Sequence, residues 1–313
     1  MSQSLIVLEA LVPVLVTIGV GALLRKFNIL RAEVEQGMMQ MVVQVLMPAL
    51  TLANIIGNES LKDIGEVGMF AGFGCVSLLV SLPLAYFLAG VFGLSRGNGK
   101  RTFGVCNGIQ NYGYMGIPLL LTMFPGEGLL GVLFTHNVGV ELAMWTVGVA
   151  LMSGDKKFSW NLVLKPPVLA VIAGLLINFV GLDFLFVGAP MKSLEMLGAP
   201  AIPIALIVIG AGLVELLRKE RFAWNVAIGS VLVRLMILPA LMIAAAYFLP
   251  IPTVLKQVVV IQAAMPSAMF PIVLAKHYGG KPEVAVQAVV ATTVVCFITM
   301  PIVITLGMQI LGI

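Results

Sequence analysis

Apolar residues run through this chain in long blocks, and short polar stretches separate one block from the next. A helix needs roughly 20 mainly apolar residues to cross about 30 Å of hydrocarbon. Ten blocks approach this length, and little sequence remains between them for a soluble domain. The pattern predicts an all-α membrane protein with ten transmembrane helices, at about residues 5–24, 36–56, 67–92, 102–124, 128–152, 162–182, 195–217, 222–249, 257–276 and 283–311.

The basic residues predict how these helices are oriented. The loops after the odd-numbered blocks hold fourteen Lys and Arg residues, whereas the opposite loops hold only Lys62, Lys192 and Lys256. Cytoplasmic loops carry the excess of basic residues, so we expect both termini on the outer side of the inner (plasma) membrane. The first block lacks the basic start and cleavage site of a signal peptide, and we expect it to be a retained helix.

Composition narrows the classes of function. Hydrophobic residues make up 60% of the chain and charged residues 10%, against roughly 25% charged residues in a soluble domain. The net charge of +4 follows from the basic loops, so nucleic acid is not an expected partner. Cys75, Cys106 and Cys296 lie in apolar blocks, where we expect small apolar packing rather than a metal or a cofactor. The sequence pairs no nucleophile with a base, so an enzyme is not expected.

Prolines recur at a nearly constant distance along the chain. Four pairs with similar flanking sequences are 153 to 156 residues apart: Pro13 and Pro167, Pro48 and Pro203, Pro83 and Pro239, and Pro118 and Pro271. This spacing predicts two five-helix repeats, residues 1–152 and 162–313. Because each repeat has an odd number of helices, the two would have opposite orientations, as in many secondary transporters. The alternative is that prolines are simply frequent in membrane helices.

Two of the predicted helices contain helix-breaking residues at equivalent places. The segment "NGIQNYGYMGIP" (107–118) lies inside the fourth block, and "QAAMPSAMFP" (262–271) lies inside the ninth. Non-helical backbone survives in hydrocarbon only where it is buried in protein or lines a wet cavity. Both helices are therefore expected to be broken and to cross near the midplane of the membrane.

Each break is expected to end at the start of a second half-helix. Pro118 and Pro271 suit its first position, where the missing N–H costs little. The free N–H groups of that turn favour an anion or a carboxylate. The residues expected to bind substrate are Asn107, Gln110, Asn111, Gly116, Pro118, Gln262, Pro266, Ser267 and Pro271. For each polar side chain, the alternative is that it only satisfies backbone groups that the break has freed.

The broken segments resemble those of a known family. "NYGYMGIPLL" (111–120) and "QAAMPSAMFPIVLAKHYG" (262–279) are similar to the crossing segments of the auxin efflux carrier family, which includes plant PIN-FORMED carriers and small bacterial acid transporters. The resemblance implies the fold of the bile acid/sodium symporter group, in which a transport bundle (spans 3–5 and 8–10) slides against a scaffold (spans 1, 2, 6 and 7). It also implies an anionic substrate carried by alternating access. Residues 257–276 contain no Asp or Glu to hold sodium, so sodium coupling is not expected.

Ionisable residues inside the predicted helices are candidates for proton or ion coupling, because a charge at the bilayer centre is costly. Glu141 lies mid-helix with Asn137 one turn earlier, and His136 and Arg234 also fall within predicted spans. Structural roles are the alternatives. Glu141 and Arg234 would then form an ion pair, and His136 would be a neutral hydrogen-bonding residue.

Together these features predict a secondary carrier of small organic anions, such as auxin-like, mono- or dicarboxylic acids. Proton coupling, exchange or the membrane potential would drive it. A passive anion channel with the same polar centre is the alternative. Glycine-rich spans such as "GVGALL" permit close helix packing, including packing in a homodimer, without identifying an interface.

Overall fold

The computed structural model describes residues 3–113, 115–126, 128–154, 166–219 and 223–313. Within these ranges the protein is all helical and has no named β-strand. Six helical stretches are long and apolar enough to cross a membrane: Glu33–Ile55, Ile64–Leu88, Leu129–Ser153, Ala189–Val214, Trp224–Phe248 and Pro282–Leu311. The chain therefore has the helices of a multi-pass membrane protein.

Helices are found in the described part of each of the ten predicted ranges. In the first half they are α1 (Gln3–Lys26), α2 (Ala32–Met41), η1 (Val42–Leu46), α3 (Met47–Ile55), η2 (Glu59–Leu61), α4 (Ile64–Leu88), α5 (Lys100–Gly108), α6 (Gly116–Met123), α7 (Leu129–Ala143), η3 (Met144–Gly148) and α8 (Val149–Ser153). In the second half they are α9 (Pro166–Val180), η5 (Asp183–Phe186), α10 (Ala189–Gly198), α11 (Ala201–Lys219), α12 (Trp224–Leu232), η6 (Val233–Ile237), α13 (Leu238–Phe248), α14 (Thr253–Ala264), α15 (Phe270–His277) and α16 (Pro282–Leu311). Most of the boundary between the predicted repeats lies outside the described residues.

Two predicted spans consist of two helices each, α5 with α6 and α14 with α15. The seventh predicted span differs from the structure in another way, because it begins inside the separate helix α10. The division between α10 and α11 falls at residues 199–200. Pro200 has no backbone N–H with which to continue α10, so the chain bends there before α11 begins.

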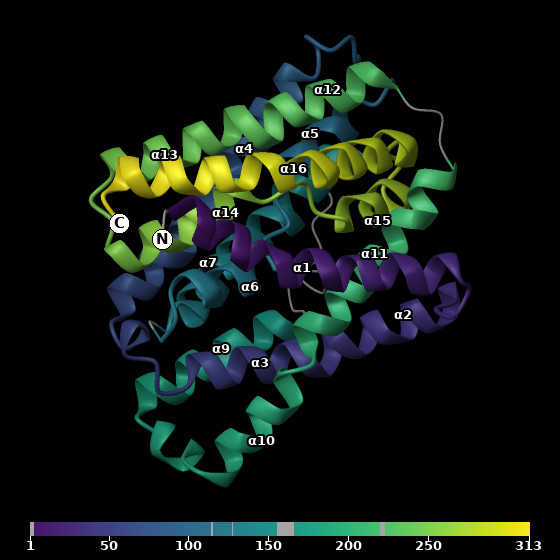
Figure 1. Cartoon of the computed structure of the whole chain (residues 1–313). Helices are drawn as coiled ribbons and strands as arrows, with labels where there is room; N and C mark the ends of the chain where they lie inside the picture. Colours follow the sequence, from purple (N-terminus) through teal and green to yellow (C-terminus); the bar gives the residue numbers. More distant parts are fainter. Residues whose placement is uncertain (1–2, 114, 127, 155–165, 220–222) are drawn as a thin grey trace.

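The helices pack in two groups. In one group, α1 lies along α11, and α3 packs against both α9 and α10. In the other, α4 packs against α5 and α7, and α16 packs against α12 and α14. Figure 1 shows α12, α13 and α16 on one side of α1, and α2, α3, α9 and α10 on the other.

Glycines allow the closest helix contacts in both groups. In α1, a Cβ on Gly21 would overlap the Ile207 carbonyl of α11. In α4, a Cβ on Gly74 would overlap the His136 carbonyl of α7. Small residues at such positions let membrane helices pack backbone to backbone.

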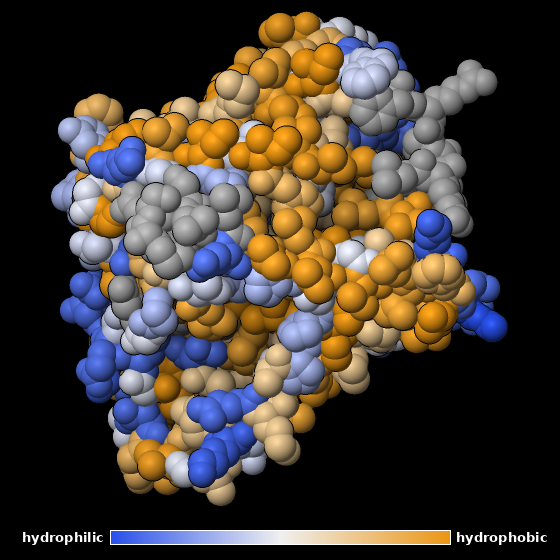
Figure 2. Space-filling model, viewed as in Figure 1, coloured by the Kyte–Doolittle hydropathy of each residue, from blue (hydrophilic) through white to orange (hydrophobic). Residues whose placement is uncertain are grey.

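The surface and the chain ends agree with a membrane setting. Hydrophobic residues cover most of the middle of the face in Figure 2, and hydrophilic residues gather near its left edge. Large apolar side chains that are more than half exposed include Val16, Val76, Ile228, Ile298 and Ile302. The two termini lie at the same end of the molecule (Figure 1).

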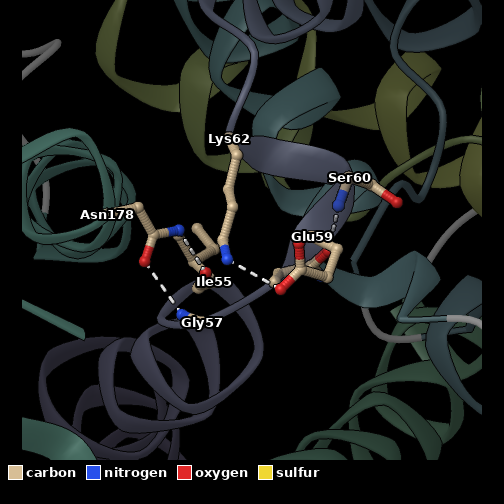
Figure 3. Close-up of polar contacts among 7 residues, drawn as sticks. Ile55, Gly57, Glu59, Ser60, Lys62 and Asn178 are labelled. Carbon is tan, nitrogen blue, oxygen red and sulfur yellow. Dashed lines mark hydrogen bonds and ion pairs between the residues drawn. The ribbon is translucent and has the colours of Figure 1, made fainter. Parts of the chain in front are cut away.

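Polar contacts near the end of α3 tie it to α9 (Figure 3). The Asn178 side chain donates to the Ile55 carbonyl (2.7 Å) and accepts from the Gly57 N–H (2.8 Å). It thereby satisfies backbone groups that the helix end leaves free. Nearby, Lys62 and Glu59 form an ion pair in which Lys62 Nζ donates a hydrogen bond to Glu59 Oε1 (2.7 Å). This hydrogen bond raises the pKa of Lys62.

In the described ranges, three long helical stretches contain a π-helical turn, η1, η3 and η6. Two of these turns, η1 and η6, directly precede a helix with a proline in its first turn. A proline removes one backbone donor and disturbs the turn before it, which accounts for both positions. The turn η6 carries Arg234, and η3 carries Trp145. Single π turns often occur at functional sites.

Candidate binding site at the helix crossing

The two interrupted helices meet at their breaks. The Asn111 N–H donates to the Pro266 carbonyl (2.7 Å), and the Ala268 N–H donates to the Ile109 carbonyl (3.0 Å). The two segments form a short antiparallel bridge. Each break therefore supplies partners for backbone groups of the other, which is what buried non-helical backbone requires.

Both half-helices that leave the crossing have a proline in their first turn. Pro271 is the second residue of α15, and Pro118 is the third residue of α6. The sequence predicts each proline at the first helical position. Pro271 lies one residue later than predicted and Pro118 two residues later, because each helix begins before its proline. Both prolines still lie where a backbone N–H has no acceptor within the helix, so neither costs a helical hydrogen bond.

Three amide side chains at the crossing have polar atoms that no described residue satisfies. Gln110 Nε2 and Gln262 Oε1 are buried without a hydrogen-bond partner. The Asn111 side chain, 7% exposed, also makes no hydrogen bond within the described part of the chain. Gln262 Nε2 donates to the Tyr112 carbonyl (2.9 Å), and Gly116 packs beside it. A buried unsatisfied polar group costs about 1–3 kcal/mol, so these atoms favour a ligand or water that would pair with them.

Asn107 and Ser267 have a different role, because their polar groups are satisfied within the protein. Asn107 Nδ2 donates to the Phe103 carbonyl (2.9 Å) and to Ser230 Oγ of α12 (3.1 Å). Ser267 Oγ donates to Asn107 Oδ1 (3.4 Å), and the Ser267 N–H donates to Thr292 Oγ1 of α16 (3.2 Å). These two residues join α5, α12 and α16 around the crossing.

Glu141 reaches the crossing from α7. Its carboxylate accepts hydrogen bonds from the Tyr112 hydroxyl and from Trp145 Nε1, the latter at 2.6 Å. Asn137, one turn earlier, donates from Nδ2 to the Tyr112 carbonyl (3.2 Å). His136 is fully buried, with Nδ1 3.2 Å from Asn137 Oδ1. Glu141 and Asn137 are therefore connected to the break through one residue, Tyr112.

Arg234 reaches the crossing from the other side. Its Nε donates to the Met265 carbonyl (2.9 Å), and Nη2 donates to the carbonyls of Gln262 (3.3 Å) and Ala263 (3.4 Å). A cation is favourable there, because these carbonyls form the negative end of α14. Nη1 is buried and has no partner among the described residues. An ion pair between Arg234 and Glu141 is not present.

The residues at the crossing that the sequence did not predict include Trp145, Ser230, Thr292 and Tyr112. Trp145 follows Glu141 by four residues, and Ser230 precedes Arg234 by four, so helical spacing alone would have placed each beside its neighbour. No such signal was available for Tyr112. It lies in the break, where irregular backbone decides the direction of the side chain.

A cavity of about 190 Å³ lies between α3, α6 and α7, and α6 leads from it to the crossing. It contains none of the predicted site residues and is lined by Asn54, Leu120, Leu121, Phe124, Gly126, Gly128, Leu129 and Leu130. In the described part of the chain, no three His, Cys, Asp or Glu residues group as a metal site would need.

The fold and the crossing define a class of protein. It is a multi-pass membrane protein whose polar centre is built from two interrupted helices, a plan typical of secondary transporters. The chain belongs to the membrane transport protein family, that of the auxin efflux carriers, whose model matches residues 6–159 and 151–304.

Similar proteins are also described as transporters or carriers. An uncharacterized transporter of Methanothermobacter thermautotrophicus is 26% identical over 303 residues, which cover 94% of this chain and 96% of the relative. An uncharacterized transporter of Methanocaldococcus jannaschii is 25% identical over 306 residues, 92% of this chain and 95% of the relative. Auxin efflux carrier component 8 of Arabidopsis thaliana is 30% identical over 99 residues, 32% of this chain and 27% of that protein.

Proposed function

We propose that the protein is a secondary transporter of small organic anions, with the substrate bound at the helix crossing. The observation that carries this proposal is the set of buried, unsatisfied amide atoms on Gln110 and Gln262, together with the unpaired side chain of Asn111. A carboxylate has oxygens to accept from the amide donors. A bridging water would donate a hydrogen bond to the remaining acceptor, Gln262 Oε1.

Two further features favour an anion over a neutral or cationic substrate. The first turns of α6 and α15 both start at the crossing, and helix N-termini attract negative charge. The guanidinium of Arg234 adds a full positive charge at the end of α14. Because the plant relative is an auxin efflux carrier, auxin-like acids belong to the substrate class, along with mono- and dicarboxylates.

The burial of the crossing supports alternating access. Gln110 is 2% exposed and Gln262 is fully covered, so a substrate enters only if the protein rearranges. The packing supports a division between a scaffold that contains α1 to α3 and α9 to α11, and a transport bundle that contains α4 to α8 and α12 to α16. In an elevator mechanism the bundle would carry the crossing from one side to the other.

The remaining architecture is part of the proposal. Ten membrane helices, arranged as inverted repeats 1–152 and 162–313, would place both breaks at the same depth near the midplane. Termini at the same end of the molecule (Figure 1) fit an even number of spans. The basic loops favour an inner membrane location with both termini outside.

Binding is tested first, on purified protein in detergent. Thermal shift and calorimetry would use acetate, lactate, benzoate, indole-3-acetate, malonate and succinate, each beside its neutral amide, with and without sodium. We expect at least one carboxylate to stabilise the protein while its amide does not. Equal stabilisation by acids and amides would contradict an anion site.

Counterflow then separates a carrier from a channel. Proteoliposomes loaded with unlabelled acid are diluted into labelled acid. A carrier accumulates label transiently above equilibrium, because bound substrate returns with the mobile site. A monotonic approach to equilibrium would support the passive channel instead.

A further inference from the structure

Two residues of opposite charge stand at the ends of one hydrogen-bonded path across the crossing. Arg234 Nη2 donates to the Gln262 carbonyl, and Gln262 Nε2 donates to the Tyr112 carbonyl. The Tyr112 hydroxyl in turn donates to the Glu141 carboxylate. Both connecting residues are neutral, so the path separates a cation from a carboxylate by two side chains that belong to the two breaks.

The charges on this path have a consequence for any anion that binds there. Arg234 is fully buried, and its hydrogen bonds go to backbone carbonyls rather than to an acidic side chain. With the site empty, the positive charge of Arg234 and the negative charge of Glu141 cancel across the crossing. A bound carboxylate adds one negative charge, and a net charge inside the membrane is costly.

Protonation of Glu141 would restore neutrality, and its hydrogen bonds can accommodate the proton. Trp145 Nε1 only donates, so it must keep an acceptor oxygen on the carboxyl group. A phenol hydroxyl both donates and accepts. The Tyr112 hydroxyl can therefore turn and accept from the new O–H, so that the carboxyl group keeps both of its hydrogen-bonding partners while the phenol hydrogen points away from it.

The position of Tyr112 links that proton to the break. Its carbonyl accepts from Asn137 Nδ2 and from Gln262 Nε2, so its backbone is held while its hydroxyl reverses. On α4 and α7, the described titratable groups besides Glu141 are Glu66, Cys75, Tyr86 and His136, and of these Cys75 joins the apolar cluster that contains Val140 and Trp145. Gln262 of α14 contacts Tyr112 and Phe270 of α15 contacts Trp145, and both side chains are neutral. The charged or titratable groups of these helices, Lys256, Lys276 and His277, lie at the helix ends away from the break.

We propose that Glu141 takes up one proton when a carboxylate binds beside Arg234, so that the protein carries proton and monocarboxylate together in equal numbers. The proton comes from water to a Glu141 carboxylate oxygen on binding and returns to water on release. Arg234 holds the anion's charge, and Glu141 balances it. This inference rests on the proposed function.

Proton uptake on binding is the direct test. Purified protein in weakly buffered solution with a pH indicator is mixed at neutral pH with benzoate or indole-3-acetate, both already ionised there. We expect about one proton taken up per carboxylate bound, because binding and protonation are linked. Calorimetry in two buffers of different ionisation enthalpy gives an independent count.

Variants separate the two charges. Glu141→Gln should bind both acids at least as tightly as the wild type and take up no proton. Arg234→Gln should weaken binding at least about thirtyfold, as when one member of a buried charge pair is removed, whereas Arg234→Lys should recover most of that loss. Thr146→Val, on the same stretch of helix and outside the path, is the matched control and should behave as the wild type.

The outcomes distinguish this inference from the proposed function. Binding without proton uptake in the wild type, or equal uptake in Glu141→Gln, would overturn proton coupling and leave anion transport standing. Binding that survives undiminished in a folded Arg234→Gln protein would show that Arg234 does not hold the anion's charge. If neither acid binds the wild type, the proposed function fails first, and this inference fails with it.

Discussion

Two asparagines of the same break have opposite environments. Every polar atom of the Asn107 side chain has a partner, on α5 itself, on α12 and in the other break. The Asn111 side chain has none among the described residues, although its backbone N–H is paired. The first residue therefore has a structural role, and the second is free to bind a ligand.

Asn111→Ala should weaken binding without lowering stability. The change removes an amide that makes no internal hydrogen bond, so the fold loses little. A hydrogen bond to a charged ligand contributes about 1.5–3 kcal/mol, which corresponds to a loss of roughly tenfold to a hundredfold in affinity. Calorimetry with the best-binding carboxylate measures it, and unchanged affinity would remove Asn111 from the site.

Asn107→Ala should instead lower stability. It leaves Ser230 and Ser267 without their buried partner, at a cost of about 1–3 kcal/mol for each unsatisfied group. The apparent melting temperature in detergent should fall well below that of Asn111→Ala. If the two variants melted alike, Asn107 would not be the structural member of the pair.

For single residues, the sequence predicts which side chains lie at the crossing better than it predicts the role of each side chain. The glycines, amides and prolines of both breaks indicate the crossing, and the structure brings Gln110, Asn111 and Gln262 together there. The satisfied state of Asn107 depends on Ser230, which lies 123 residues away. No local pattern could reveal that contact.

At the scale of the elements, the breaks follow from the chemistry of glycine and proline. A proline cannot donate, and a membrane offers no water to replace the lost bond. The sequence therefore predicts where α5 and α14 end. The partner of each broken segment is decided by packing of the whole chain, and the proposed repeat is what makes the two equivalent.

Glycines along α4 give a test of helix packing. Gly74→Val should lower stability by about 1–3 kcal/mol, because its Cβ would overlap the His136 carbonyl of α7 and force the helices apart. The comparison is Gly72→Val, two residues away, whose Cβ would meet nothing within 4 Å. Thermal unfolding in detergent measures both, and equal melting temperatures would mean that the close contact does not contribute.

At the scale of the whole molecule, the main question is which helices move. We propose that the scaffold and the bundle are two sets of helices that pack mainly among themselves, with α1 against α11 in one and α4 against α7 in the other. Sequence alone cannot define such sets, because helices far apart in the chain join them, as α1 and α11 do. The resemblance to a known family supplied that division in advance.

A cross-link between the two sets should stop transport but not binding. A Cβ on Gly212 of α11 would lie 2.9 Å from Met269 Cε in the second break, so a short bis-thiosulfonate reagent should join cysteines at both positions through reducible disulfides. The three native cysteines are replaced first. Cross-linking should reduce counterflow by about tenfold or more, since the bundle can no longer slide, and reduction should restore it.

The control joins two parts of the same set. A Cβ on Gly229 of α12 would lie 2.6 Å from Phe92 Cγ, so Phe92→Cys with Gly229→Cys cross-links within the bundle. Transport should survive that cross-link. Full activity in the cross-linked Gly212→Cys and Met269→Cys protein would argue against sliding of the bundle.

The backbone pairing at the crossing also bears on how such a chain could have arisen. Each interrupted segment supplies hydrogen bonds that the other lacks, so either half alone would expose unpaired peptide groups to lipid. An ancestor half as long would have needed a second copy of itself, inserted upside down, before it could persist in a bilayer. Separately expressed halves should therefore be degraded when alone and rescued when made together.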